Sequence, residues 1–108
     1  METTSFYRQT MASTYATRKF FEKVTTDLQT QLREWDAEVC VEVEKWRQYV
    51  VKVTFENRLY RMNLTKNEIE LYQHESPFAL DRLILDALIK QGLTLKQPAG
   101  NYLDVVYA

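Results

Sequence analysis

The sequence predicts an α+β fold: a two-layer sandwich in the order helix, four-stranded antiparallel meander, helix, followed by a β-prone C-terminal tail. Two segments with helical apolar spacing flank a middle segment, residues 38–72, in which apolar and polar residues alternate with a period of two. Only short connections separate the alternating runs, and short connections join antiparallel neighbours. We expect both helices to cover the apolar face of the sheet.

Residues 1–13 are predicted to form a partly ordered tail, because they are rich in threonine and serine. The spacing of Tyr7, Met11 and Tyr15 equally allows the first helix to begin within this segment. The remaining residues, 14–108, contain no linker and no internal repeat, and we expect them to form a single domain.

The first predicted helix covers residues 14–35, where apolar residues recur every three or four positions along one stripe. These residues are Phe20, Phe21, Val24, Leu28, Leu32 and Trp35. Charged and polar residues fill the opposite side, as is typical of a helix that buries one face against the core and exposes the other to solvent.

Four predicted strands follow after a short link. They cover residues 38–44, 49–56, 59–65 and 68–72. A two-residue turn at Asn57-Arg58 would pair residue 53 with residue 62. The alternating apolar residues would then share one face: Val39, Val41, Val43, Tyr49, Val51, Val53, Phe55, Tyr60, Met62, Leu64, Ile69 and Leu71. The other face carries glutamates and further polar residues, so we expect it to be solvated.

The second predicted helix begins at Ser76-Pro77, with serine as N-cap and proline as the first residue, and ends at Gly92. Its apolar face is broad and includes Leu85 and Ile89. The tail that follows, residues 102–108, is apolar and β-prone. Three placements are open for it: an added edge strand, packing over the helices, or pairing with another copy of the chain.

Composition and charge disfavour several classes of protein. The net charge is −1, from 14 basic and 15 acidic residues. Proteins that bind phosphate backbones usually carry a basic excess, so nucleic acid is disfavoured as a partner.

The single cysteine, Cys40, forms no intramolecular disulfide, and its acidic neighbours are expected to raise the pKa of its thiol. Secretory and membrane-spanning segments are not found, so we expect a cytoplasmic protein without membrane contact.

Residues that could carry catalysis are few. His74 is the only histidine, so a site built from several histidines is excluded. Paired carboxylates such as Glu68 and Glu70 project from the predicted solvated face, where water has free access. Phosphate-binding glycine-rich loops do not occur. We therefore predict a protein that is not an enzyme and that uses no cofactor or metal.

The tip of the first predicted hairpin is the main candidate contact surface. It contains Lys45, Trp46, Arg47 and Tyr49. Trp46 breaks the inward alternation and lies between two cations, so it suits stacking on a base or on a side chain of a partner protein. The alternative is that Trp46 folds back over the sheet edge or a helix end, since large aromatic side chains seldom stay exposed.

These observations favour a small interaction or regulatory protein that acts through protein–protein contacts, with a homodimer as one form of the hypothesis. The candidate residues for self-association lie on the second helix and in the tail: Leu85, Ile89, Leu103, Val105 and Tyr107. The alternative hypothesis is a nucleic-acid-binding module that uses Trp46 and its basic neighbours.

Overall fold

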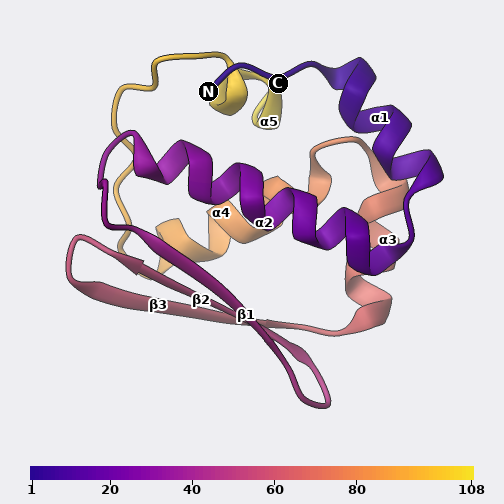
Figure 1. Ribbon diagram of the computed structural model, residues 1–108, viewed down its shortest axis with the longest axis horizontal. Helices are drawn as coiled ribbons and strands as arrows, with labels where there is room; N and C mark the ends of the chain where they lie inside the picture. Colours follow the sequence, from indigo (N-terminus) through magenta and orange to yellow (C-terminus); the bar gives the residue numbers. More distant parts are fainter.

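The computed structural model describes all residues, 1–108, as an α+β structure with five helices and one three-stranded antiparallel sheet (Figure 1). In chain order the elements are α1 Ser5–Thr14, α2 Thr17–Arg33, β1 Cys40–Lys45, β2 Tyr49–Phe55, β3 Arg58–Leu64, α3 Lys66–Glu75, α4 Ala79–Lys90 and α5 Tyr102–Val106. The α+β class with an antiparallel sheet is confirmed. The sheet has three strands instead of the predicted four, and there are five helices instead of two. None of these helices combines the length and the apolar character needed to cross a membrane.

The sheet has the order β1-β2-β3, with antiparallel hairpins as predicted. Val53 lies opposite Tyr60 and not opposite residue 62, so the predicted register between β2 and β3 is wrong by two residues. The turn consists of Glu56 and Asn57, whose φ angles of 50° and 64° are typical of a type I′ turn, the form that matches the twist of a hairpin. An offset of two residues leaves every side chain on its predicted face.

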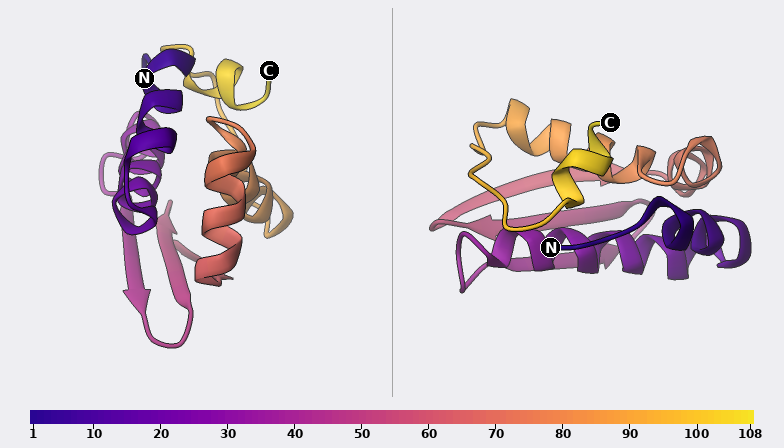
Figure 2. Two further views of the ribbon diagram at one scale, coloured as in Figure 1. Left: turned by 90° about the vertical axis from the view of Figure 1, so that its right-hand side faces the viewer. Right: turned by 90° about the horizontal axis from the view of Figure 1, so that it is seen from above.

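One face of the sheet packs on the helices. Figures 1 and 2 show α2 and α4 running across it, and α2 contacts β1 while α4 contacts β3. Val51 and Val53 from the sheet, Phe21 and Leu28 from α2, and Ile84 from α4 are at most 1% exposed. Burial of an apolar side chain of this size stabilises the fold by about 1.5–3 kcal/mol, so this shared core joins the sheet to the helical layer.

The opposite face of the sheet is largely open to solvent, as the alternation predicts. Glu42, Thr54, Arg61 and Asn63 on this face are exposed. Lys52 in the central strand lies opposite Glu42 and Arg61, and its ammonium contacts Glu44 diagonally at 2.9 Å. An ion pair between neighbouring strands contributes about 0.2–1 kcal/mol.

The predicted fourth strand, residues 68–72, is wrong because these residues lie in α3. The Thr65 hydroxyl accepts a hydrogen bond from the Glu68 N–H at 3.1 Å, and the Glu68 carboxylate accepts one from the Thr65 N–H at 2.9 Å. This reciprocal capping box stabilises the start of a helix. Ile69 and Gln73, one helical turn apart, are buried, whereas Leu71 is 67% exposed. A strand would have placed residues 69 and 71 on the same face.

The predicted start of the second long helix is wrong by a few residues, whereas its end is confirmed. Ser76 and Pro77 lie in the turn before α4 and are not its N-cap and first residue. At the other end Gly92 has a φ angle of 110°, and the Leu93 N–H donates to the Leu88 carbonyl at 3.0 Å. This bond and the left-handed glycine are those of a Schellman motif.

The C-terminal tail, predicted as β-prone, forms the short helix α5. Tyr102, Leu103 and Val106 are buried, and their spacing places them on one side of a helix. The β propensity of this segment is overridden because a helix directs all three side chains into the core. Among the three placements open from the sequence, the structure has the tail packed on the helices, with α5 against α4.

Most of the segment predicted as a partly ordered tail, residues 1–13, lies in the helix α1, Ser5–Thr14. The Thr4 hydroxyl caps this helix by accepting a hydrogen bond from the Tyr7 N–H at 3.2 Å. The Gln73 side-chain amide of α3 donates to the carbonyls of Ala12 and Tyr15, each at 3.0 Å, and so holds the C-terminal end of α1. The helical spacing noted in this segment therefore belongs to a helix separate from α2.

Replacement of Glu56 tests the turn between β2 and β3. We expect Glu56→Gly to be more stable than Glu56→Ala by about 1 kcal/mol, because glycine adopts a positive φ without the steric penalty of a Cβ atom. Both variants lose the ion pair between Glu56 and Lys96 at 2.6 Å, so the comparison isolates the backbone term. Urea unfolding of the two variants measures the difference, and equal stabilities would contradict a left-handed conformation at this position.

Candidate functional site

The β1–β2 hairpin ends in a three-residue loop, Trp46 to Gln48, between the paired residues Lys45 and Tyr49. The Trp46 N–H donates to the Gln48 carbonyl at 3.0 Å, and the Trp46 side chain is 81% exposed. Figures 1 and 2 show this tip extending past the ends of the helices. The alternative in which Trp46 folds back over the sheet is therefore wrong, and the indole is free for contact.

The other predicted contact residues at the tip divide between surface and core. Arg47 is exposed beside Trp46. The Lys45 ammonium lies 5.3 Å from the centroid of the Tyr49 ring, which is buried and packs edge-on against Phe21 at 5.3 Å between centroids. Tyr49 thus anchors the base of the hairpin on α2, while Lys45, Trp46 and Arg47 form its exposed part.

A hollow of about 320 Å³ lies between the first half of α2 and the hairpin. Its lining consists of Arg18, Phe21, Glu22, Val43, Lys45 and Tyr49. Val43 is 39% exposed although its position in β1 directs it to the helical side of the sheet. The lining therefore combines three apolar and aromatic side chains with three charged ones, and Lys45 and Tyr49 place it directly beside the tip that carries Trp46.

The two edges of the sheet differ. At β3 the Gln91 side-chain amide accepts a hydrogen bond from the Arg61 N–H at 3.2 Å and donates one to the Arg61 carbonyl at 2.8 Å, as a neighbouring strand would. At β1 the Gln29 side chain of α2 accepts from the Val41 N–H at 3.0 Å. Beyond Val41 the edge of β1 has no such partner up to the tip.

The solvent face of β1 is acidic. It carries Cys40, Glu42 and Glu44, and the Lys52 ammonium contacts Glu44 at 2.9 Å. This ammonium lowers the pKa of Glu44 below its ordinary value. The Cys40 thiol donates to Glu42 at 3.4 Å, and this hydrogen bond raises the pKa of the thiol, as expected from the sequence. The thiol is therefore not activated as a nucleophile.

The residues predicted for self-association do not form one exposed surface. Leu85 and Leu103 are 0% and 8% exposed and belong to the core of the chain. Ile89 and Tyr107 are each 40% exposed, and Val105 is half-buried. Only the latter three are accessible to a partner.

His74 lies exposed in the last turn of α3. Among the histidine, cysteine, aspartate and glutamate side chains, no group of three or more is arranged to hold a metal ion.

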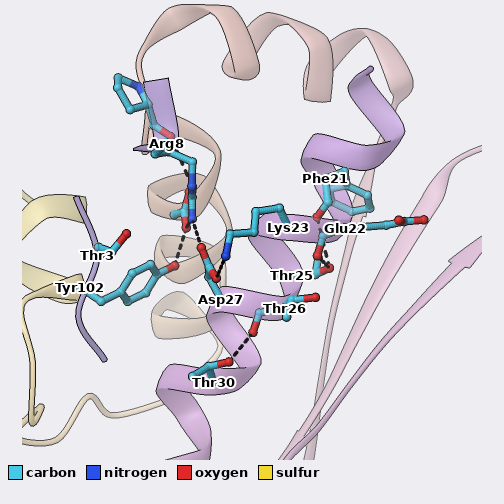
Figure 3. Close-up of polar contacts among 12 residues, drawn as sticks. Thr3, Arg8, Phe21, Glu22, Lys23, Thr25, Thr26, Asp27, Thr30 and Tyr102 are labelled. Carbon is cyan, nitrogen blue, oxygen red and sulfur yellow. Dashed lines mark hydrogen bonds and ion pairs between the residues drawn. The ribbon is translucent and has the colours of Figure 1, made fainter. Parts of the chain in front are cut away.

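A buried arginine, Arg8 of α1, is the main feature that the sequence did not predict (Figure 3). Its guanidinium donates to both carboxylate oxygens of Asp81 and to Asp27 Oδ2 at 2.6 Å. The Pro77 carbonyl accepts a further hydrogen bond at 3.3 Å, and the Tyr102 hydroxyl donates to Asp81 Oδ2 at 2.5 Å. We call Arg8, Asp27, Asp81 and Tyr102 the buried polar cluster; its members come from α1, α2, α4 and α5.

Burial shifts the titration of this cluster. Burial raises the pKa of Asp81, although the Arg8 charge opposes this shift. Burial and the Asp81 carboxylate together raise the pKa of the Tyr102 hydroxyl well above its ordinary value. Burial alone would lower the pKa of Arg8, but the charges and hydrogen bonds of Asp81 and Asp27 together outweigh burial and raise it. The guanidinium therefore stays charged.

The buried polar cluster is complete within the chain. The Lys23 ammonium contacts Asp27 at 2.9 Å, so two cations face two carboxylates. The Phe78 ring covers the guanidinium, and its centroid lies 4.5 Å from Arg8 Cζ. Perturbed pKa values mark catalytic sites or structural ion-pair networks. Full pairing and the burial of Arg8 and Asp81 support a structural role for this cluster, although Arg8, Lys23 and Asp27 also line a surface hollow of about 540 Å³.

A sequence signal for the cluster exists in the apolar faces of the helices. The sequence predicts Asp27 with the charged residues on the solvent side of α2, but it lies at the border of the apolar stripe, three positions after Val24, and is 4% exposed. Asp81 precedes Leu85 by four positions on the apolar face of α4. A carboxylate among core residues must be paired with a cation or hydrogen-bond donors that are also buried. The sequence does not indicate that Arg8 is this partner.

Replacement of Arg8 tests the cluster. We expect Arg8→Met to lower the free energy of unfolding by about 3–5 kcal/mol, because it leaves the buried Asp81 carboxylate without a cation and leaves Asp27 with Lys23 alone. Arg18→Met is the matched control: its side chain is 79% exposed, so the change should stay within about 0.5 kcal/mol. Chemical denaturation followed by circular dichroism measures both. Similar losses in the two variants would contradict a buried pair.

Alkaline pH tests Tyr102. In the native state the hydroxyl of Tyr102 keeps its proton at a pH where the unfolded chain, with an ordinary pKa near 10, has released it. The free energy of unfolding therefore falls as the pH rises above about 10. This group alone lowers it by up to about 1.4 kcal/mol per pH unit. The Tyr102→Phe variant has no hydroxyl group at this position and therefore cannot show this pH dependence. We expect the stability advantage of the wild type over Tyr102→Phe to shrink between about pH 9 and pH 11. A constant difference over this range would show that Tyr102 titrates alike in both states.

Comparison of the chain with protein-family models, with curated proteins and with solved structures finds no match. The function is therefore inferred from the hairpin, the sheet edges and the buried polar cluster themselves.

Proposed function

We propose that this chain is a small interaction or regulatory protein without catalytic activity, which acts by binding a partner protein through the exposed part of the β1–β2 hairpin. The observation that carries the proposal is Trp46, 81% exposed at a tip that extends past the helices. Tryptophan and arginine are the residues most enriched among those that dominate the binding energy of protein interfaces. Trp46 and Arg47 are adjacent at this tip.

The surroundings of the tip support a protein partner. The hollow between α2 and the hairpin has apolar walls at Phe21 and Val43, and Val43 remains 39% exposed beside it. An apolar recess next to an exposed aromatic side chain and rimmed by charges resembles the core and rim of a protein interface. The tip and the hollow together offer a partner both an anchor and a pocket.

Self-association with a second copy is a separate form of protein–protein contact, and it would use a surface outside the hairpin. Ile89, Val105 and Tyr107 retain exposed surface for it, whereas Leu85 and Leu103 are enclosed in the core. Sedimentation velocity at high protein concentration distinguishes a monomer from a dimer.

Nucleic acid is the second candidate partner, because Trp46 lies between Lys45 and Arg47 and could stack on a base. The acidic residues Glu42 and Glu44 occupy the neighbouring solvent face of β1. Their charge opposes the approach of a phosphate backbone, and this favours a protein partner.

A photo-crosslinking side chain at position 46 tests the proposal in the cells that produce the protein. We expect benzoylphenylalanine in place of Trp46 to form a discrete adduct with one protein. The same side chain in place of Leu59, 58% exposed on β3, should not form this adduct. The identical adduct from both positions, or none from position 46, would contradict binding through the tip.

Tryptophan fluorescence distinguishes binding of nucleic acid at the tip from binding of a protein partner. In a Trp35→Phe background Trp46 is the only tryptophan, so quenching on titration with a single-stranded oligonucleotide reports stacking at the tip. We expect no quenching at low salt. Strong, salt-dependent quenching would favour nucleic acid over a protein partner.

A further inference from the structure

We infer that the partner binds as an extended segment that pairs antiparallel with the open edge of β1, with apolar residues toward α2 and basic residues toward solvent. This inference rests on the proposed function and names the partner class. Addition of a strand to a free sheet edge is an established mode of peptide recognition, in which main-chain bonds supply affinity and alternate side chains supply specificity.

The backbone of β1 is available for such pairing near the tip. The Val41 N–H points away from β2, since it donates to Gln29. Backbone groups alternate in direction along an antiparallel strand, so those of Val43 and Lys45 also point away from β2. β1 is an edge strand, and no bond within the chain closes this stretch. By contrast, Gln91 occupies the edge of β3.

The inner side of the open edge selects apolar residues. A residue added opposite Val43 would point to the same side of the sheet as Val43. That side contains the hollow, where Phe21 and Tyr49 lie deepest in the core and the charged side chains of Arg18, Glu22 and Lys45 complete the lining. An apolar side chain there would cover Val43, which is now 39% exposed. Burial of that apolar surface favours binding.

The outer side of the open edge selects basic residues. Glu42 and Glu44 alternate with Val43 and project to the solvent face. Side chains of an added strand would stand directly beside them, where opposite charges attract and like charges repel. Lys52 already contacts Glu44 from the β2 side, but Glu42 has no ion pair. Lysine or arginine at alternate positions of the partner therefore complements this face.

The same charges exclude a second copy of β1 as the added strand. Antiparallel pairing of residue 41 with residue 43 of another copy places Glu42 opposite Glu42. Pairing of residue 43 with itself places Glu42 opposite Glu44. Both registers set like charges directly across from each other. The chain is thus protected against pairing with itself at this edge.

The test uses the full chain and a labelled peptide of about eight residues, a typical strand length, that alternates valine with lysine. Fluorescence anisotropy measures binding. We expect a peptide with glutamate in place of lysine to bind about tenfold more weakly or not at all. N-methylation of the valine amides, which face Val43, should abolish binding, whereas N-methylation of the lysine amides should preserve it. Equal binding of all four peptides would overturn strand addition.

Variants of the chain supply the second arm. Glu42→Lys with Glu44→Lys should reverse the preference, so that the glutamate peptide binds about tenfold more tightly than the lysine peptide. Val43→Pro removes the open N–H at an edge position that tolerates proline, and should abolish binding of the valine–lysine peptide. An unchanged preference in the double variant overturns the inference even if Val43→Pro does not fold.

The two proposals fail in different ways. A specific adduct from position 46 without binding of the valine–lysine peptide leaves the proposed function in place and overturns the strand-addition inference. If position 46 forms no specific adduct and the valine–lysine peptide does not bind, both the proposed function and the strand-addition inference are overturned.

Discussion

Burial of the Arg8 guanidinium is the constraint on which the helical layer depends. A buried arginine is tolerated only when its charge and its hydrogen-bond donors are matched, and here Asp27 and Asp81 match them. Tyr102 extends the same bonds to α5. Four helices, two from the first third of the chain and two from the last third, are thereby held together at one point, and the core residues of α2 and α4 face the sheet in one arrangement.

A fixed helical layer leaves the β1–β2 hairpin as the part of the sheet that extends away from the body of the molecule. Phe21 packs on Tyr49 and anchors the hairpin at its base. Beyond that contact, Trp46 at the tip and the edge at Val43 remain uncovered. The asymmetry of the sheet supports its role in binding: Gln91 closes one edge with its side-chain amide, while the other edge is open where the acidic residues lie.

The differences between prediction and structure have specific physical causes. Residues 69 and 71 alternate as a strand would, but the Thr65–Glu68 capping box, which is legible in the sequence, starts a helix there. The two-residue error in register arises because the turn uses Glu56 and Asn57, the pair with positive φ, where a glycine-free sequence offers no clear signal. Trp46 stays exposed, at 81%, in the loop at the tip of a hairpin that points away from the helices.

The sequence by itself determined the α+β class, the three hairpin strands with their inner and outer faces, the stripe of α2 and the glycine that ends α4. Each of these follows from local periodicity or from the conformational freedom of one residue type. Only the tertiary structure decided that residues 102–106 are helical, that Arg8 is buried, and which sheet edge stays open. These features depend on contacts between segments far apart in the chain, such as Arg8 with Asp81 and Gln91 with Arg61, and local spacing carries no information about such partners.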